Sequence, residues 1–398
     1  MAGSAQPVIG GSDRPTIDME YVRTLLLELL EIPSPTGYTD QIVHRVGDEL
    51  RQLGIPFELT RRGAIRADLE GELRSPDRAL VAHLDTLGAM VKALKSNGRL
   101  ALAPIGTWSS RFAEGARVSV FTDLGCRRGT ILPLKASGHT FGDDVDTQPI
   151  GWDYIEVRLD EIVQSAEELV TLGIHVGDFV AVDPAPEYLP ESGFLNSRHL
   201  DDKAGVAVVL GAAKAVLDAG RRLPIDCHLI FTISEEVGSG SSHTLHGDVA
   251  EMVTIDSATQ APGQNSSEFG VTIAAMDSAG PFDWHLNRKL IDLCDEHRIR
   301  HHRDVFVHYR SDSASAVEAG NDLRTALVCF GVDASHGWER THDGALQALG
   351  DLLVLYMLSE PTFLSDRESM TSVIEEFPTQ PIEMAEPADG ALPEHEAQ

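Results

Sequence analysis

The chain has 398 residues, of which 62 are Asp or Glu and 32 are Lys or Arg, so its formal net charge is -30. A field this negative repels nucleic acid and anionic membrane surfaces, and we exclude both as main partners. The hydrophobic fraction of 42% is ordinary for a folded chain. A chain of this length is expected to form two domains plus tails.

Two features of the sequence predict a cytoplasmic protein. No apolar run approaches the length of a membrane span, and no basic-then-apolar signal peptide opens the chain. The four cysteines, Cys126, Cys227, Cys294 and Cys329, lie far apart without paired spacing. They are expected to be reduced, buried thiols rather than disulfides or zinc knuckles.

The chain begins with residues 1–16, a stretch rich in Gly, Ser and Pro that predicts a flexible N-terminal arm. A helical pattern over Tyr21–Leu53 follows and is broken at Pro33-Ser34-Pro35. Helices and buried strands then alternate, which predicts an α/β layered domain with a largely parallel sheet over residues 17–91 and 190–362. The expected strands are Ala79–His83, His228–Ile233, Met252–Ile255, Val271–Ala275 and Ala326–Phe330, and the further helices are Ala204–Ala219, Trp284–His297 and Leu346–Leu358.

Residues 92–189 break this alternation with short strands and turns. The expected strands there are Arg117–Phe121, Gly129–Pro133, Tyr154–Arg158 and Asp178–Val182. An insertion whose two ends meet leaves the host fold intact. We therefore predict a small β-rich domain inserted into the α/β domain.

The end of the chain has a different composition. Residues 363–398 combine many acidic residues with prolines. This composition cannot bury enough apolar surface to fold, and it predicts a disordered acidic tail.

The most informative stretch is Ile233-Ser234-Glu235-Glu236-Val237-Gly238, where two adjacent carboxylates follow an apolar strand. Neighbouring side chains on an extended segment point to opposite sides. One Glu can therefore hold a metal while the other faces a water. A Glu-Glu pair alone is usually solvated surface, so this interpretation depends on the residues that accompany it.

Other ligand-type residues stand at the ends of predicted strands, where open α/β sheets place their sites. His83 ends the strand that begins at Ala79, and a neutral imidazole is a ligand for zinc or cobalt. Asp85, two residues on, is positioned to orient that imidazole. Asp256 ends the strand Met252–Ile255. Each of these residues alone is more often structural.

Two further positions complete the set. Asp201 stands just before a predicted helix, where it can bridge two cations, while Asp202 has a simple alternative role as an N-cap. His336 and His342 both lie in the loop before the final helix. We favour His342 as the last ligand because it is nearest the helix, with His336 as the competitor.

Together these residues supply five metal ligands and one free carboxylate. Two metals close together polarise a carbonyl and lower the pKa of a bridging water. The free Glu then takes the proton of that water and passes it to the leaving amine. The set predicts a dinuclear metal-dependent hydrolase of amide bonds.

The order and local sequence of these motifs resemble metallopeptidase family forty-two, the glutamyl and deblocking aminopeptidases that form tetrahedral particles. The resemblance runs from Val22 to Leu358. The matching stretches are Ile32-Pro33-Ser34-Pro35-Thr36-Gly37, Ala82-His83-Leu84-Asp85 with Gly88, Ser165-Ala166-Glu167-Glu168 and Gly173-Ile174-His175-Val176-Gly177-Asp178.

The resemblance implies a zinc-peptidase-like three-layer α/β catalytic domain whose inserted domain serves for dimerisation or as a lid. It implies two divalent ions per subunit, zinc or cobalt with manganese as the alternative. It also implies small peptide substrates and a homo-oligomer built from dimers, up to a dodecamer. By this resemblance Asp201 is a bridging ligand, and His83 and Asp256 complete one metal site. Glu236 forms the second site with a histidine of the C-terminal half, for which we favour His342 over His336. Glu235 is the general base, and Asp85 supports His83.

The sequence departs from the family pattern at three places. Thr86 stands where the family has Glu, the final histidines lack the family's His-Ser-Pro context, and Arg310-Ser311-Asp312-Ser313 replaces a Gly-Gly-Thr-Asp loop. Arg310, Asp312 and His336 are therefore candidates for contacting substrate or for replacing a metal ligand. These departures, with Ser34–Asp40, resemble a subgroup found with the pathway of the osmolyte N-acetylglutaminylglutamine amide.

The sequence thus predicts a metallo-aminopeptidase that acts on short peptides or on a capped dipeptide. A related co-catalytic zinc deacylase or carboxypeptidase uses the same ligand order, but such relatives carry a dimerising α+β insert rather than a β-rich one. A non-catalytic binding protein that keeps the fold is the third alternative.

Overall fold

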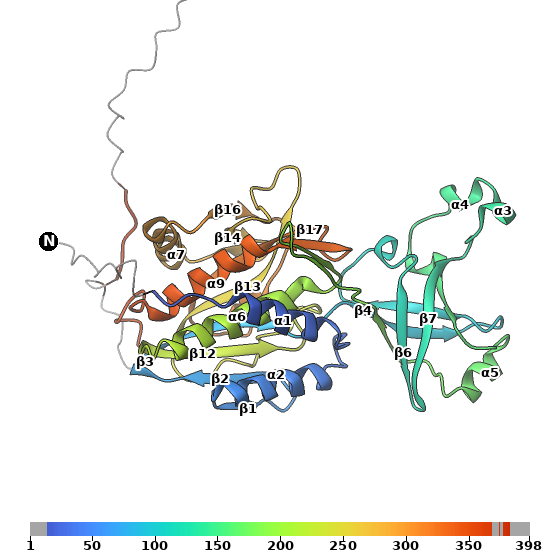
Figure 1. The fold of residues 1–398 in the computed structure, drawn as a ribbon, viewed down its shortest axis with the longest axis horizontal. Helices are drawn as coiled ribbons and strands as arrows, with labels where there is room; N and C mark the ends of the chain where they lie inside the picture. Colours follow the sequence, from blue (N-terminus) through green and yellow to red (C-terminus); the bar gives the residue numbers. More distant parts are fainter. Residues whose placement is uncertain (1–13, 368–373, 375–376, 383–398) are drawn as a thin grey trace, which may run out of the picture.

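The apolar runs expected as strands lie side by side in one 12-stranded mixed sheet of the computed structural model, which describes residues 14–367, 374 and 377–382 (Figure 1). The centre of the sheet is parallel, in the order β12 (Leu223–Thr232), β3 (Gly71–His83), β13 (Val249–Gln260) and β17 (Arg324–Asp333). Parallel strands end at the same edge of a sheet, so the residues that follow them meet there. The remaining strands of this sheet are β1 (Phe57–Leu59), β2 (Ile65–Leu69), β10 (Glu187–Leu189), β11 (Phe194–Ser197), β14 (Val271–Asp277), β15 (Gly280–Pro281), β16 (His301–Val305) and β18 (Glu339–His342).

Helices cover both faces of this sheet because its strands are apolar on both sides. Leu80 and Ala82 of β3 belong to the main core, whereas Ala79 and Val81 pack in a smaller cluster with Ala316 of α8 (Asp312–Glu318) on the other face. The result is a three-layer α/β domain, which confirms the expected fold class. The helices that contribute to the main core are α1 (Met19–Leu30), α2 (Asp40–Leu53), α6 (Leu200–Asp218), α7 (Trp284–His297) and α9 (Asp343–Leu358).

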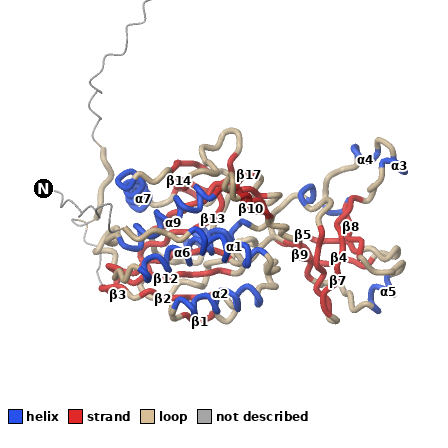
Figure 2. The backbone as a smooth tube through the Cα atoms, viewed as in Figure 1, coloured by secondary structure: helices blue, strands red, loops and turns tan. Residues whose placement is uncertain are grey.

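The inserted segment forms a closed barrel of six strands that stands to one side of the sheet (Figures 1 and 2). The barrel has its own apolar interior, which includes Val120, Ile131 and Val157. The barrel strands begin at Gly88 and end at Val182, whereas the expected insertion covers residues 92–189. The expected end is too late because β10 belongs to the large sheet. Its strands are β4 (Gly88–Leu94), β5 (Leu100–Ile105), β6 (Arg117–Thr122), β7 (Gly125–Pro133), β8 (Ile155–Leu159) and β9 (Phe179–Val182), and its short helices are α3 (Gly138–Phe141), α4 (Asp144–Thr147) and α5 (Ala166–Thr171).

Most of the two terminal segments lies outside the described residues. Of the expected N-terminal arm, residues 14–16 are described. Arg14 forms an ion pair with Asp351 of α9 at 2.8 Å, so the end of the arm contacts the folded domain. The expected disordered tail over residues 363–398 is described only at 363–367, 374 and 377–382. In the part of the chain that is described, no helix is long and apolar enough to cross a membrane.

The four cysteines are free thiols in the structure. Cys227, Cys294 and Cys329 are buried as expected, and burial raises the pKa of the Cys227 and Cys294 thiols to about 12. Cys126 differs from the expectation because it is exposed on β7 of the barrel.

Candidate metal centre

The carboxyl edge of the central sheet brings together His83, Asp201 and Asp256. His83 is the last residue of β3, Asp256 lies in β13, and Asp201 lies at the start of α6. The backbone at Asp201 is not helical, so its side chain is not carried on the helix surface. One ligand atom from each residue lies within 4.8 Å of the other two, and all three residues are buried. His83 Nε2 lies 3.1 Å from Asp201 Oδ1.

The orientation of His83 is set by the backbone of Asp85. His83 Nδ1 donates to the main-chain carbonyl of Asp85 at 2.9 Å, which leaves Nε2 directed at Asp201. The Asp85 carboxylate, which we expected to hold this ring, lies farther away, with Oδ1 3.7 Å from Nδ1. Asp85 therefore supports His83, but through its main chain.

The Asp85 carboxylate instead holds the Glu235-Glu236 pair. Its oxygens accept the main-chain N–H groups of Glu235 at 3.1 Å and Glu236 at 3.3 Å, and the Thr36 hydroxyl at 2.6 Å. The two Glu side chains diverge from this fixed backbone. Glu235 Oε2 lies 3.9 Å from His83 Nε2, and Glu236 lies closer to His336.

His336 occupies the far side of Asp201. Its Nε2 lies 3.5 Å from Asp201 Oδ2 and 3.7 Å from Glu236 Oε2. Its Nδ1 donates to the carbonyl of Thr107 at 2.9 Å, in the loop that follows β5 of the barrel. Asp201 consequently has one oxygen directed toward each histidine.

The expected ligand His342 is not brought to this cluster. His342 is the N-cap of α9, where its Nδ1 accepts the N–H of Gly344 at 2.8 Å and its Nε2 donates to the carbonyl of Ser192 at 2.8 Å. The first turn of a helix leaves N–H groups without partners, and a capping side chain satisfies one of them. Because both ring nitrogens are engaged, we take His336 rather than His342 into the proposed metal site.

The two candidates in the 310–313 segment lie at the border of the site. Asp312 is buried and accepts hydrogen bonds from the Thr232 hydroxyl at 2.6 Å and from the Ser241 N–H at 2.7 Å. It therefore links the end of β12 to the loop that follows. Arg310 lines the cleft above the cluster and pairs with Glu318, with Nη1 and Oε1 2.9 Å apart. The structure therefore places neither residue among the ligand atoms.

Several residues of the site were not predicted from the sequence. Glu339 is buried and accepts the main-chain N–H groups of Asp201 at 3.1 Å and of His336 at 2.9 Å. Tyr309 is partly buried, and its pKa is raised by desolvation and then by the charge of Asp256. The available signals were weak: Glu339 follows His336 by three positions, and Tyr309 directly precedes Arg310.

Asp202, for which an N-cap role was the simple alternative, also belongs to the site. It is fully buried, and its Oδ2 accepts the main-chain N–H of His83 at 3.2 Å. A Cβ on Gly205 would lie 2.2 Å from Asp202 Oδ1. Gly205 therefore leaves the space that the carboxylate occupies.

The charge balance of the cluster suits divalent cations. Burial, followed by the charge of Asp201, raises the pKa of Asp256, and burial raises the pKa of Glu236 to about 8. Burial lowers the pKa of His336, but the carboxylates of Asp201 and Glu236 outweigh it and raise the value to about 10. Buried carboxylates in this number need a compensating positive charge. Imidazole and carboxylate donors fit zinc and similar ions.

A cleft of about 590 Å³ opens over the cluster. Its volume lies within the range of roughly 300–1,000 Å³ that is usual for sites binding small molecules. Gly106 and Thr107 from the barrel side form part of its wall. The remaining lining residues are Asp201, Glu235, Glu236, Val237, Gly238, Asp256, His308, Tyr309, Arg310 and His336.

A buried histidine–carboxylate cluster at the carboxyl edge of an α/β sheet, beneath a cleft and beside a barrel insert, is the arrangement of a metal-dependent hydrolase. The family model described as M42 glutamyl aminopeptidase matches residues 63–352. The chain belongs to this family.

Individual relatives agree with this assignment. The chain is 36% identical over 336 residues to YhfE of Bacillus subtilis (strain 168), which is named as a candidate aminopeptidase. The aligned region covers 84% of this chain and 96% of YhfE. The fold of the present chain is similar to that of aminopeptidase APDkam598 from the archaeon Desulfurococcus kamchatkensis, with a TM-score of 0.78 and 21% identity. The superposition covers 89% of this chain and 99% of APDkam598. The Pyrococcus horikoshii TET1 peptidase gives a TM-score of 0.75 at 21% identity, with coverage of 85% and 100%.

Proposed function

We propose that this protein is a dinuclear aminopeptidase that removes N-terminal residues from short peptides. The observation that supports this proposal is that the two carboxylate oxygens of Asp201 face different histidines. Oδ1 lies 3.1 Å from His83 Nε2, and Oδ2 lies 3.5 Å from His336 Nε2. His83, Asp256 and Asp201 Oδ1 would hold one divalent ion. His336, Glu236 and Asp201 Oδ2 would hold the other. Such a pair of ions, when bound, polarises the substrate carbonyl and acidifies a water.

Glu235 is the general base in this proposal. It remains outside both ligand sets, and its carboxylate lines the cleft beside His83. From that position Glu235 Oε2 can accept a proton from the attacking water and deliver it to the leaving amine. Asp85 acts as a positioning residue because it fixes the main chain of Glu235 and Glu236.

We propose zinc or cobalt as the ions, with manganese as the alternative, because two imidazoles and several carboxylates suit these metals. The protein would act in the cytoplasm, where its free thiols stay reduced. A capped dipeptide of the osmolyte pathway is the particular substrate implied by the subgroup resemblance of Ser34–Asp40. Arg310 lines the cleft but is paired with Glu318, so a peptide carboxylate would have to compete with that ion pair.

We propose that the protein acts as a homo-oligomer built through its barrel. The Pyrococcus horikoshii TET1 peptidase can assemble into a tetrahedron or a large octahedral shell. Large apolar side chains are exposed on the barrel of this chain, among them Leu124, Ile150, Ile162 and Val176. Exposed apolar side chains of this size would be stabilised by burial against another subunit.

The test is hydrolysis of peptides by protein whose metal content is controlled. We expect chelated protein to lose activity on dipeptides with free N-termini and to regain it when zinc or cobalt is added, with about two equivalents bound at the metal centre. N-acetylated dipeptides serve as the parallel substrates. Metal-loaded protein that cleaves only the acetylated set would indicate a deacylase, and metal-loaded protein that cleaves neither set would indicate a binding protein.

An Asp85→Asn variant is expected to lower kcat by roughly 10–100-fold, the usual effect of losing a partner outside the ligand sphere. The amide keeps one acceptor oxygen and places an NH2 group against the second N–H, so the main chain of Glu235 and Glu236 loses one of its two hydrogen bonds to residue 85. Steady-state kinetics with metal analysis checks this result. Asp40→Asn, at an exposed position of α2, is the matched control and should change neither kcat nor the metal content. Unchanged kcat in Asp85→Asn would contradict the positioning role.

A further inference from the structure

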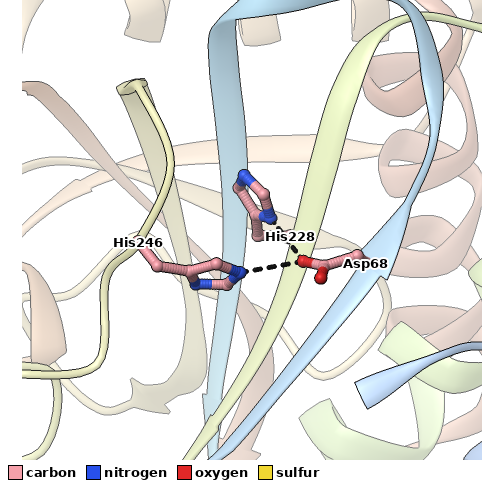
Figure 3. Close-up of side chains that lie close together, drawn as sticks. All are labelled: Asp68, His228 and His246. Atoms are coloured by element: carbon pink, nitrogen blue, oxygen red, sulfur yellow. Dashed lines mark hydrogen bonds and ion pairs between the residues drawn. The ribbon is translucent and has the colours of Figure 1, made fainter. Parts of the chain in front are cut away.

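A second group of ligand-type side chains lies on the sheet away from the metal centre (Figure 3). Asp68 of β2, His228 of β12 and His246 of the loop before β13 direct their polar atoms at one another. Asp68 Oδ1 lies 2.7 Å from His228 Nδ1 and 2.8 Å from His246 Nε2. The three ligand atoms lie within 4.8 Å of one another.

This group shares no residue with the metal centre described above. Asp68 and His228 face each other directly in the antiparallel pairing of β2 with β12. His228 lies within β12, whereas Glu235 and Glu236 follow the end of that strand. The group is therefore a separate location on the sheet.

The surroundings of His228 are those of a metal ligand. Its other ring nitrogen, Nε2, lies 3.3 Å from Oδ2 of Asp77, which is only 3% exposed and also accepts the Asp248 N–H at 2.7 Å. Histidines that bind metals usually donate their second ring N–H to such a carboxylate, which fixes the ring. Gly247 adopts a φ of +69°, and a Cβ there would lie 2.5 Å from Asp77 Oδ2 and 2.9 Å from His228 Nε2. The glycine thus permits the close approach of the loop to this pair.

We propose that Asp68 Oδ1, His228 Nδ1 and His246 Nε2 bind one divalent transition-metal ion, preferably zinc. Two imidazoles and one carboxylate form a donor set that zinc accepts, with a fourth position available for water. The Asp68 side chain is 44% exposed, so solvent reaches that position. This proposal is independent of the aminopeptidase mechanism.

The ion would fasten one end of the segment that carries the proposed general base. This segment runs from Glu235, after β12, to Asp248, before β13. Its middle is already held where Ser241 donates its N–H to Asp312. An ion at His246 would fix the far end of the segment to the strand that carries Asp68, and its role would be structural.

The experiment is zinc analysis of the full chain after chelation, reloading with zinc chloride and desalting. We expect about three equivalents in the unaltered protein, two at the metal centre and one at this group. His246→Ala should lose about one equivalent and should lose part of the zinc-dependent rise in Tm. The matched control is His243→Ala, an exposed histidine of the same segment, which should keep both.

Two more variants make the outcome decisive. Asp68→Asn keeps an oxygen that can accept hydrogen bonds but removes the charged ligand, so it should also lose about one equivalent. The double variant His83→Ala/His336→Ala should still bind zinc at this group, even if the aminopeptidase proposal is incorrect. Equal zinc content in the unaltered protein, His246→Ala and Asp68→Asn would overturn the proposal and leave a hydrogen-bonded cluster alone. An equal loss in His243→Ala would overturn it as well.

Discussion

Replacing His336 with alanine is expected to remove one bound ion per chain and to lower kcat/KM by more than about 100-fold. Losing a partner outside the ligand sphere costs roughly 10–100-fold, and a direct ligand should cost more. The geometric reason is that His336 Nε2 faces both Asp201 Oδ2 and Glu236 Oε2, at 3.5 and 3.7 Å. Without the imidazole, the second ion would keep carboxylate donors only. Metal analysis and steady-state kinetics on the same preparation measure both effects.

His342 supplies the matched comparison, because it lies near His336 in the sequence and has a different role in the structure. A His342→Asn variant retains a side chain that caps helices well, so the Gly344 N–H keeps an acceptor. We expect this variant to keep both ions and most of its activity. The reverse pattern, with ions lost in His342→Asn and kept in His336→Ala, would show that the second ion site includes His342.

Replacing Glu235 with glutamine is expected to lower kcat by roughly 100-fold or more, the size of effect that removal of a general base produces. The amide has nearly the same shape as the carboxylate but cannot accept the proton of the attacking water. The hydrogen bond to the Asp85 carboxylate uses the main-chain N–H of Glu235 and not its side chain, so the backbone should stay in place. Metal content should therefore remain that of the unaltered protein.

The neighbouring residue gives the contrast for this experiment. Glu236→Gln should lower both activity and metal content, because Glu236 lies beside His336 in the proposed second ion site. A Glu235→Gln variant that turns over at the normal rate would remove Glu235 from the mechanism. A Glu235→Gln variant that loses an ion would instead make Glu235 a ligand.

The elements of the fold were largely predictable because their signals are local. The run Ala79–His83 is apolar on both faces, and it became the second half of β3 in the centre of the sheet. The helix expected at Trp284–His297 has the same bounds in the structure. The closure of the inserted strands into a barrel was not predictable, since it depends on pairing between β4 and β9, which lie far apart in the sequence.

The site shows the same division between local and distant information. His83 and Asp85 are brought together by their spacing alone, as are Glu235 and Glu236. The choice between His336 and His342 depended instead on Thr107 of the barrel loop and on the cap of α9, which no local pattern reveals. Sequence distance from the helix favoured His342, and the need of the helix for a cap explains why that residue lies elsewhere.

The hydrogen bond from His336 to the Thr107 carbonyl couples the geometry of the catalytic domain to that of the barrel. The loop after β5 must present the main-chain oxygen of Thr107 at the position of the His336 ring. We therefore expect a change in the length of this loop to be more harmful than a substitution at Thr107, whereas Gly106, with a φ of +81° and Leu87 Cδ2 2.5 Å from the position of a Cβ, has no room for a side chain. A chimera that receives the barrel of a relative should remain functional only when the loop length after β5 is preserved.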